Sequence, residues 1–489
     1  MISACSNGPT SLYHSPWDIS QPAQNSQTGQ NETAEVLQPQ IDWRDQHNIQ
    51  RHVGQSDLVP PASNSLKVID VEQRLETPNQ GGVISSRHTL PTQPQHAQGP
   101  KVKVAFLAPL SGTHKEIGQA LLNAAQLALF DVGHDNFEII PRDTKGTPLG
   151  AQQAARSVVQ ENVDLILGPL LSDSVRAVKS TVSSSDTPII AFSTDWKVAG
   201  GQTYIMGFLP FAQVARVTNY ALYQGYDQMA FLAPQNEYTS LVSRTLSYTL
   251  KRQNTALVKA RTYSALQNET DIVIAEFTEF ERRKAEMDLI KQDLQERIDL
   301  ALPHKDLDAE RELKSLQRRK ATSDLTFNAL MIPIGGQGLK TLSTYLGHYE
   351  IDTDTVKLIG TGLWDDITLT KEPILKGGWF AAPDPDLRQD FLENYTQTYG
   401  EKPPRLATLG YDATALAAIL AQTGHGLTAE QVYNRTRLVS ERGFAGIDGI
   451  FRFRPDGLVE RGLAVLEVRP NGLYVIDPAP TAFLSAKRS

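Results

Sequence analysis

Cysteine, long apolar runs and an excess of positive charge are all lacking in this chain of 489 residues. Its single cysteine, Cys5, excludes an intramolecular disulfide and a cysteine-based zinc site. The best apolar run, Ala413 to Ala421, is about half of the roughly 18 to 20 residues that span a bilayer. With 47 basic and 55 acidic side chains the net charge is −8, which argues against a dedicated nucleic-acid binder.

Signatures of catalysis are lacking as well. The chain has no HExxH and no GxSxG pattern, and the glycine-rich stretch from Gly335 to Thr341 is an incomplete phosphate loop, because Leu339 separates its last glycine from the lysine. Asp365 and Asp366 are adjacent, so their carboxylates are expected to point apart. Five of the ten histidines precede residue 101, which gives a metal cluster little support. We expect no enzyme activity, no catalytic residue, no cofactor and no metal.

The first 100 residues are expected to form a disordered tether. Residues 6 to 100 hold ten of the 28 prolines and many glutamines, serines and asparagines, without sustained apolar periodicity. Such a segment cannot bury enough apolar surface to offset its ordering entropy. The stretch from Asp42 to Val53 carries a few apolar and histidine residues and is the one candidate for a short docking element.

From Lys101 onward, short apolar runs alternate with amphipathic segments. We expect strands at 102–108, 137–140, 164–167 and 188–192, with helices at 118–132, 150–161 and 173–183 between them. A second series has helices at 212–224 and 238–253 and strands at 228–233, 257–263, 327–332 and 356–359. Strands that alternate with helices of 10 to 15 residues indicate parallel sheets built from βαβ units. The fold class is therefore α/β, with two doubly wound lobes.

The expected boundaries follow from these series. We assign residues 101–211 and 383–440 to lobe 1. Residues 212–382 and 441–478 form lobe 2, which the hairpin-like strands after Gly446 complete, and 479–489 form a tail.

An insertion at about residues 271–322 is not needed by a minimal two-lobed fold. From Glu279 to Lys320, 22 of 42 residues are charged. Apolar residues recur on one helix face, and a second set offers a seam on a return helix. The first set is Val273, Phe277, Phe280, Met287, Leu294, Ile298 and Ala301, and the second is Leu307, Leu313 and Leu316. We expect an antiparallel helical hairpin, either an interaction arm or a solvated insertion without a partner.

Three loops of lobe 1 resemble the cleft loops of type I periplasmic binding proteins of the leucine, isoleucine and valine kind. They are Ala108-Pro-Leu-Ser-Gly112, Leu167-Gly-Pro-Leu-Leu-Ser172 and Phe192-Ser-Thr194. In that family, hydroxyls and backbone N–H groups of such loops hold the carboxylate of an amino acid, as loops at strand ends can. The resemblance implies a ligand cleft that includes Ser111, Gly112, Ser172, Ser193 and Thr194.

The second lobe departs from the pattern of amino-acid binders. The crossover Leu209-Pro-Phe-Ala212 has no acid, and the loop Gly360-Thr-Gly-Leu-Trp-Asp-Asp366 places Trp364 where an acid is expected. A ligand ammonium would be poorly paired there. The remaining cleft candidates are Tyr238, Gly336, Trp364 and Asp365. Trp364 either stacks on a ligand or fills the cleft, and Tyr238 either lines the cleft or packs.

The same loop, the charged insertion, the helix start at Leu409-Gly-Tyr-Asp-Ala413 and the tail from Gly446 to Phe453 resemble LppC-type penicillin-binding protein activator lipoproteins over roughly 101–478. The resemblance implies a non-enzymatic, extracytoplasmic regulator of peptidoglycan synthesis whose partner is a bifunctional penicillin-binding protein. A substrate-binding protein of an ABC transporter for branched-chain or other amino acids is the alternative.

The start of the chain fits a lipid anchor. Ile2-Ser-Ala-Cys5 resembles a lipobox, which makes Cys5 the expected lipidation site, and the signal peptide that should precede it is missing from the given start. We expect a periplasmic location, membrane contact only through the lipid, with the outer membrane favoured, and no nucleic-acid partner.

Overall fold

A computed structural model describes residues 67–68, 101–134, 136–264, 270–301, 303–424 and 426–483. Its contacts divide the chain into two compact units. Unit 1 contains Val214–Trp379 and Val468–Gly472, and unit 2 contains the described parts of 44–213, 380–467 and 473–489. Cys5 and most of the expected tether lie outside the described residues. Within the expected tether, β1 (Lys67–Val68) is described and pairs antiparallel with β12 (Phe444–Gly446).

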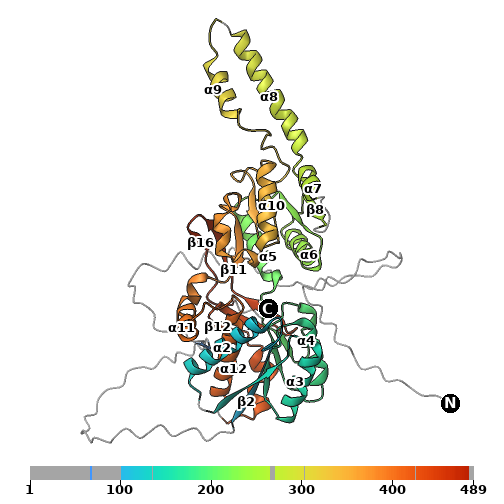
Figure 1. Ribbon diagram of the computed structural model, residues 1–489, viewed down its shortest axis with the longest axis vertical. Coiled ribbons are helices and arrows are strands. Elements are labelled where there is room, and N and C mark those ends of the chain that lie inside the picture. Colours follow the sequence, from blue (N-terminus) through green and yellow to red (C-terminus); the bar gives the residue numbers. More distant parts are fainter. Residues whose placement is uncertain are drawn as a thin grey trace, which may run out of the picture. The chain divides into compact units, whose positions relative to one another are not determined.

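Unit 2 is built on a five-stranded parallel sheet of order β3-β2-β4-β5-β6. The strands are β2 (Val102–Ala108), β3 (Phe137–Asp143), β4 (Leu165–Leu167), β5 (Ile189–Ala191) and β6 (Thr203–Ile205). The helices are α2 (Lys115–Val132), α3 (Pro148–Gln160), α4 (Ser172–Thr181), α11 (Gln389–Tyr399), α12 (Ala407–Gln422), α13 (Ala429–Val432) and α14 (Arg435–Leu438) (Figure 1). Right-handed crossovers in opposite directions place α2 on one face of the sheet and α3 and α4 on the other.

The core of unit 2 depends on the small residues of α12. Every residue from Ala407 to Ala421 is buried, and the helix packs along α2. At Gly410 a Cβ atom would lie 2.3 Å from the carbonyl oxygen of Leu121, so only glycine allows the two helices to approach this closely.

An antiparallel sheet of order β1-β12-β13-β14 also belongs to unit 2. Its later strands are β12 (Phe444–Gly446), β13 (Gly449–Phe453) and β14 (Val459–Arg461). The backbone N–H of Ile205 in β6 donates to the carbonyl of Gly457 (2.8 Å), which ties this sheet to the parallel one. The structural division therefore differs from the sequence assignment, which placed 441–478 as a whole in lobe 2.

A seven-stranded sheet of order β16-β15-β11-β10-β9-β7-β8, which we call the unit 1 sheet, contains β7, β8, β9 and β10 of unit 1. Strands β11, β15 and β16 complete it, although their residues fall partly in the ranges of unit 2. Strands β11, β10, β9, β7 and β8 pair in parallel. The strands are β7 (Met229–Pro234), β8 (Lys259–Tyr263), β9 (Ala329–Met331), β10 (Lys357–Ile359), β11 (Trp379–Ala382), β15 (Ala464–Arg469) and β16 (Gly472–Asp477). The helices are α5 (Pro210–Tyr223), α6 (Glu237–Arg252), α7 (Thr270–Phe277) and α10 (Gly336–His348). The 3-10 turns η3 (Gly362–Trp364), η4 (Ile367–Lys371) and η5 (Pro373–Leu375) also belong to unit 1, whereas η2 (Trp196–Val198) and η6 (Pro385–Arg388) belong to unit 2.

The charged insertion is a helical hairpin, as expected. It consists of α8 (Phe280–Leu300) and α9 (Leu307–Leu316), which lie side by side and extend away from α10 (Figure 1). We call this hairpin the arm. The first expected seam is divided between two helices, because Val273 and Phe277 lie in α7, whereas Met287 and Leu294 lie in α8 and are buried. On α9 the expectation was partly wrong, because Leu307 is exposed and Ala309 is buried in its place.

These units confirm the two-lobed α/β architecture. Among the described residues, no helix combines the length and the apolar character needed to cross a bilayer.

Candidate functional site

The expected binding loops of lobe 1 lie at one edge of the unit 2 sheet. Strands β2, β4 and β5 are neighbours and run parallel, so their carboxyl ends bring the loops with Ser111, Ser172 and Ser193 to the same edge. We call this the unit 2 edge. Loops at the carboxyl ends of parallel strands form the usual ligand site of open α/β sheets.

Asp143 organises the first loop of this edge. The Ser111 hydroxyl donates to its carboxylate (2.6 Å), as do the backbone N–H groups of Leu110 (2.9 Å), Ser111 (3.3 Å) and Lys145 (2.7 Å). Burial raises the pKa of Asp143, but these hydrogen bonds outweigh it and lower the pKa below its ordinary value. Asp143 therefore stays ionised and holds Ser111 in place. Gly112 is exposed and has a φ of 77°, which favours glycine.

The other two loops supply further donors. Ser172 begins α4, whose N-cap residue Leu171 has no side chain that could accept from the first-turn N–H groups. Arg176, one turn later, donates to Asp173 (2.6 Å) and to Asp195 (3.0 Å) and so joins α4 to the β5 loop. This charged bridge borders the Ser172 position.

The β5 loop presents one fixed and one accessible hydroxyl. The Ser193 oxygen is buried and accepts from the backbone N–H of Asp195 (3.0 Å), whereas Thr194 is exposed. The unit 2 edge is thus rich in hydroxyl and N–H groups, which suit an anionic group such as a carboxylate.

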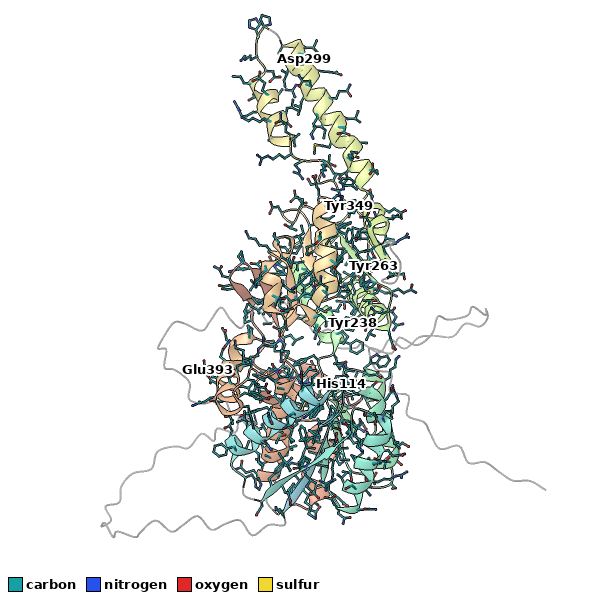
Figure 2. The ribbon with its side chains drawn as sticks, in the orientation of Figure 1. His114, Tyr238, Tyr263, Asp299, Tyr349 and Glu393 are labelled. Atoms are coloured by element: carbon teal, nitrogen blue, oxygen red, sulfur yellow. The ribbon has the colours of Figure 1, made fainter. Side chains whose placement is uncertain are left out.

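Tyr238 lies at the corresponding edge of the unit 1 sheet, where neighbouring strands β7, β9 and β10 end (Figure 2). Asn236 and Thr239 form a capping box that fixes the start of α6. The Tyr238 hydroxyl shares a hydrogen bond with Thr361 (2.9 Å). Burial raises the pKa of Tyr238 to about 12, and the bond with Thr361 lowers it only in part. Tyr238 is therefore a neutral hydroxyl that joins the β7 loop to the β10 loop.

Trp364 is enclosed by unit 1. Its side chain is fully buried, and the indole Nε1 donates to the carbonyl of Ile334 (3.0 Å). A Cβ atom at Gly360 would lie 2.2 Å from the ring, and one at Gly378 would lie 2.8 Å from it. The ring thus packs against two glycines inside the unit and presents no free face to solvent.

The last two unit 1 candidates flank this packed ring. Gly336 begins α10 and is exposed with a φ of 55°. Asp365 is half-buried, and its neighbour Asp366 caps η4 by accepting from the backbone N–H (2.9 Å) and hydroxyl (3.0 Å) of Thr368. Asp366 is therefore engaged in local structure. The described residues contain no group of three or more metal-ligating side chains that could hold a metal ion.

Two residues of these edges, Asp143 and Thr361, were not among the residues expected from the sequence. Asp143 closes β3 and Thr361 follows β10, so each is a polar residue at the carboxyl end of a parallel strand. That position was a usable signal for both.

A third region, the base of the arm, was not foreseen as a site. Arg283 of α8 is fully buried and donates only to carbonyl oxygens. Its acceptors are Thr278 (2.8 Å), Thr322 (2.6 Å), Tyr349 (2.6 Å) and Glu350 (3.2 Å). These residues belong to the start of the arm, its return segment and the end of α10. Figure 2 shows Tyr349 at the base of the arm and Asp299 toward its far end.

Carboxylates fix the return segment at the same place. Glu350 accepts from the backbone N–H groups of Lys320 and Ala321 (2.8 and 2.9 Å), and Arg319 donates to Asp352 (3.2 Å). Fixing both ends of the arm limits how its base can move relative to the unit 1 sheet.

Comparison with known proteins agrees with this architecture. A family model described as periplasmic binding protein matches residues 101–279. An uncharacterized protein, RP748, of Rickettsia prowazekii is 24% identical over 163 residues, which cover 33% of this chain and 43% of that protein. The match thus spans less than half the length of that curated relative.

Three solved structures extend the likeness to both units. A Rhodospirillum rubrum protein with a provisional assignment as a branched-chain amino acid ABC transporter has a TM-score of 0.60 at 17% identity, covering 77% of this chain and 100% of that one. An ABC transporter substrate-binding protein from Sphaerobacter thermophilus gives 0.57 at 18%, covering 78% and 99%. A solute-binding protein from Rhodopseudomonas palustris BisB5, in complex with 3,4-dihydroxybenzoic acid, gives 0.52 at 15%, covering 80% and 99%. At these identities the likeness concerns the fold. This chain has the two-lobed, leucine-binding-like fold of the type I periplasmic binding proteins.

Proposed function

We propose that the protein is a non-enzymatic, extracytoplasmic lipoprotein that regulates peptidoglycan synthesis by binding a bifunctional penicillin-binding protein. The observation that carries the proposal is the arm, which extends from unit 1 and is fixed at its base by Arg283. A hairpin that only had to stay solvated would not need a buried guanidinium with four carbonyl partners. Such a base suits a surface that meets a partner in one orientation.

The unit 1 edge also favours protein binding over amino-acid capture. The aromatic ring in the β10 loop is fully buried, and Tyr238 is held by Thr361. Asp366 is used as a cap. A free amino acid needs a partner for its ammonium as well as its carboxylate, and an unpaired buried charge costs several kcal/mol.

The test is binding of the full chain to a purified bifunctional penicillin-binding protein. Because Arg283 fixes the arm, a deletion must spare it, so Met287 to Gln317 are replaced by a short glycine-serine linker. We expect at least tenfold weaker binding with a retained unfolding transition. Equal affinity of the two chains would remove the arm from the interface, and no binding by either would refute the proposed partner.

A second candidate is a substrate-binding protein of an ABC transporter. The hydroxyls and N–H groups of the unit 2 edge favour it, and they suit a carboxylate. Thermal unfolding with branched-chain amino acids and aromatic carboxylates tests it, because a ligand at 100 times its Kd stabilises by about 2.7 kcal/mol. This candidate is supported if a compound raises the unfolding temperature of the wild type and of Thr187→Ala, whose substitution lies before β5, but not that of Thr194→Ala. No shift with any compound would count against it.

Lipidation at Cys5 completes the proposal and lies outside the described residues. Labelled palmitate should enter the natural gene product and not its Cys5→Ala variant. Equal labelling of the two would refute Cys5 as the site.

A further inference from the structure

One face of α8 exposes apolar side chains away from the seam of the arm. Leu289 is 66% exposed and Leu300 is 85% exposed. At 100° per residue, these two leucines lie within about 20° of each other around the helix. Met287 and Leu294, which are buried, lie on the opposite side. The arm therefore has an apolar seam toward its own return helix and, on its solvent side, two exposed leucines eleven residues apart.

A shallow groove that is largely open to solvent lies at the base of the arm. Leu289 and Ile290 supply its apolar surface, and Ile290 is 40% exposed. Glu286 of α8 and Thr322, Ser323 and Asp324 of the return segment supply the rest of its lining. The groove is thus lined by both apolar side chains and carboxylates.

The charge around these leucines is negative. The Arg282 guanidinium on this side is shared among Glu279 (2.8 Å), Glu286 (2.6 Å) and Asp324 (3.0 Å). Arg297, nearer to Leu300, pairs with Asp306 (3.1 Å). Farther along α8, Asp293 and Glu296 are exposed on the same side as Leu289 and Leu300. The carboxylates on this side of α8 outnumber the guanidinium groups of Arg282 and Arg297. The net charge of the face is therefore negative, which attracts cationic segments and repels a second copy of the same face.

We propose that this face of α8, with its groove, is a docking surface for a partner segment that carries apolar side chains flanked by lysine or arginine. The leucines supply the apolar contact, and Glu286, Asp293, Glu296 and Asp324 select the positive charge. Exposed apolar surface rimmed by charge is typical of protein interaction sites. This surface deepens the proposed function, because it states what the partner of the arm must present.

The first experiment compares two leucines of equal exposure in the full chain. Leu289→Lys places a positive charge in the docking surface, and Leu149→Lys, at a site that is 64% exposed in α3, serves as the control. Both variants should keep the wild-type unfolding midpoint, since both side chains are exposed. We expect Leu289→Lys to bind the penicillin-binding protein at least tenfold more weakly and Leu149→Lys to bind as the wild type does.

Charge reversal tests the selectivity of the surface. Glu296→Lys should weaken binding and reduce its dependence on salt, whereas Glu312→Lys on α9 should change neither. If the wild type binds the synthase and both Leu289→Lys and Glu296→Lys bind equally well, the docking surface is refuted while the proposed function stands.

A crosslinking experiment tests the surface independently of the proposed partner. A photoreactive benzoylphenylalanine is placed at 289 or at 149 of the full chain in living cells, and the adducts are sequenced. We expect an adduct only from 289, with a segment of another protein that contains apolar and basic residues, and its loss in Glu296→Lys. Such an adduct with a protein other than a synthase would refute the proposed function and keep the surface. An adduct with a second copy, an adduct with residues 1–100 of the same chain, or no adduct would overturn the surface.

Discussion

Two buried arginines, one in each unit, are stabilised in different ways. Arg283 of unit 1 donates to four carbonyl oxygens that come from three separate segments. Arg461 of unit 2 donates to the carbonyl of Met206 (2.8 Å), while its Nε and Nη1 have no hydrogen-bond partner. Its ring contacts are with Phe208 and Phe451 (4.9 and 5.4 Å), and the charges of Asp448 and Asp412 lie near it.

Arg283 is held by hydrogen bonds of fixed direction, whereas Arg461 is held mainly by the balance of charge around it. Carbonyl oxygens have fixed directions, so the fork of Arg283 fixes the positions of the segments that it joins. Charge attraction is less directional, and the unit 2 cluster balances two buried carboxylates against Arg461 and the partly exposed Arg405. Arg283 therefore determines the orientation of the arm, whereas Arg461 chiefly keeps Asp448 and Asp412 from being buried without compensation.

The largest expected effect is that of Arg283→Met. The variant leaves three buried carbonyl groups without their donor, at about 1 to 3 kcal/mol each when no water reaches them. We expect a loss of at least about 3 kcal/mol in the free energy of unfolding, measured by urea denaturation, and earlier proteolysis of the arm. A loss below about 1 kcal/mol would show that the carbonyls find other donors.

Arg461→Met should cost less, about 2 kcal/mol, because it removes only one carbonyl bond and Arg405 still pairs with Asp448 (2.9 Å). Urea denaturation at neutral pH measures it beside Arg283→Met. If the two variants lose the same stability, the contrast between fixed geometry and charge balance fails.

Asp412 makes the unit 2 cluster sensitive to pH. Burial, together with the charge of Asp448, raises the pKa of Asp412 to about 7, against about 3.9 in an unfolded chain. Between these values the folded state binds more protons than the unfolded state, so stability from this group falls as pH rises and the loss is complete above about pH 7.

Asp412→Asn should remove this dependence. The amide oxygen can still accept from the backbone N–H of Ile447, as Asp412 does (2.8 Å). From about pH 5 to 6.5, the free energy of unfolding of the variant should rise relative to that of the wild type by on the order of 1 kcal/mol per pH unit. A constant difference across that range would contradict the raised pKa.

The smallest expected effect is that of Arg282→Met, the direct neighbour of Arg283. Its three carboxylate partners are partly exposed, so solvent screens the ion pairs, and a loss of less than about 1 kcal/mol is expected from the same urea titration. A larger loss would show that the surface network, rather than Arg283, holds the base of the arm.

Much of the fold could be predicted from the sequence. The strand expected at 102–108 coincides with β2, and most later elements begin or end within a few residues of their expected positions. Buried parallel strands are continuous apolar runs, and the helices between them repeat apolar residues with a helical period. Both patterns can be read from short stretches of sequence. Strands β6 and β11 were missed, because three or four residues such as Thr203–Ile205 give no distinct pattern.

The site residues were less predictable. The loops of Ser111, Ser172 and Ser193 share an edge, as the order of parallel strands requires. The burial of Trp364 was not visible, because it depends on Gly360 and Gly378, which leave space for the ring. Leu307 was expected in the seam, but the backbone N–H of Ala309 donates to Asp306 at the start of α9, and Ala309 is the buried residue.

The sequence by itself determined the alternation of strands and helices, the two doubly wound units and the presence of the arm, because these depend on residue type and spacing along the chain. Only the tertiary structure decided that Arg283 is buried while its neighbour Arg282 is partly exposed, and that 441–467 pack with unit 2. Both depend on partners far away in the chain, such as Thr322, Tyr349 and Ile205. Hydrogen-bond partners that are brought together only by folding leave no local pattern in the sequence.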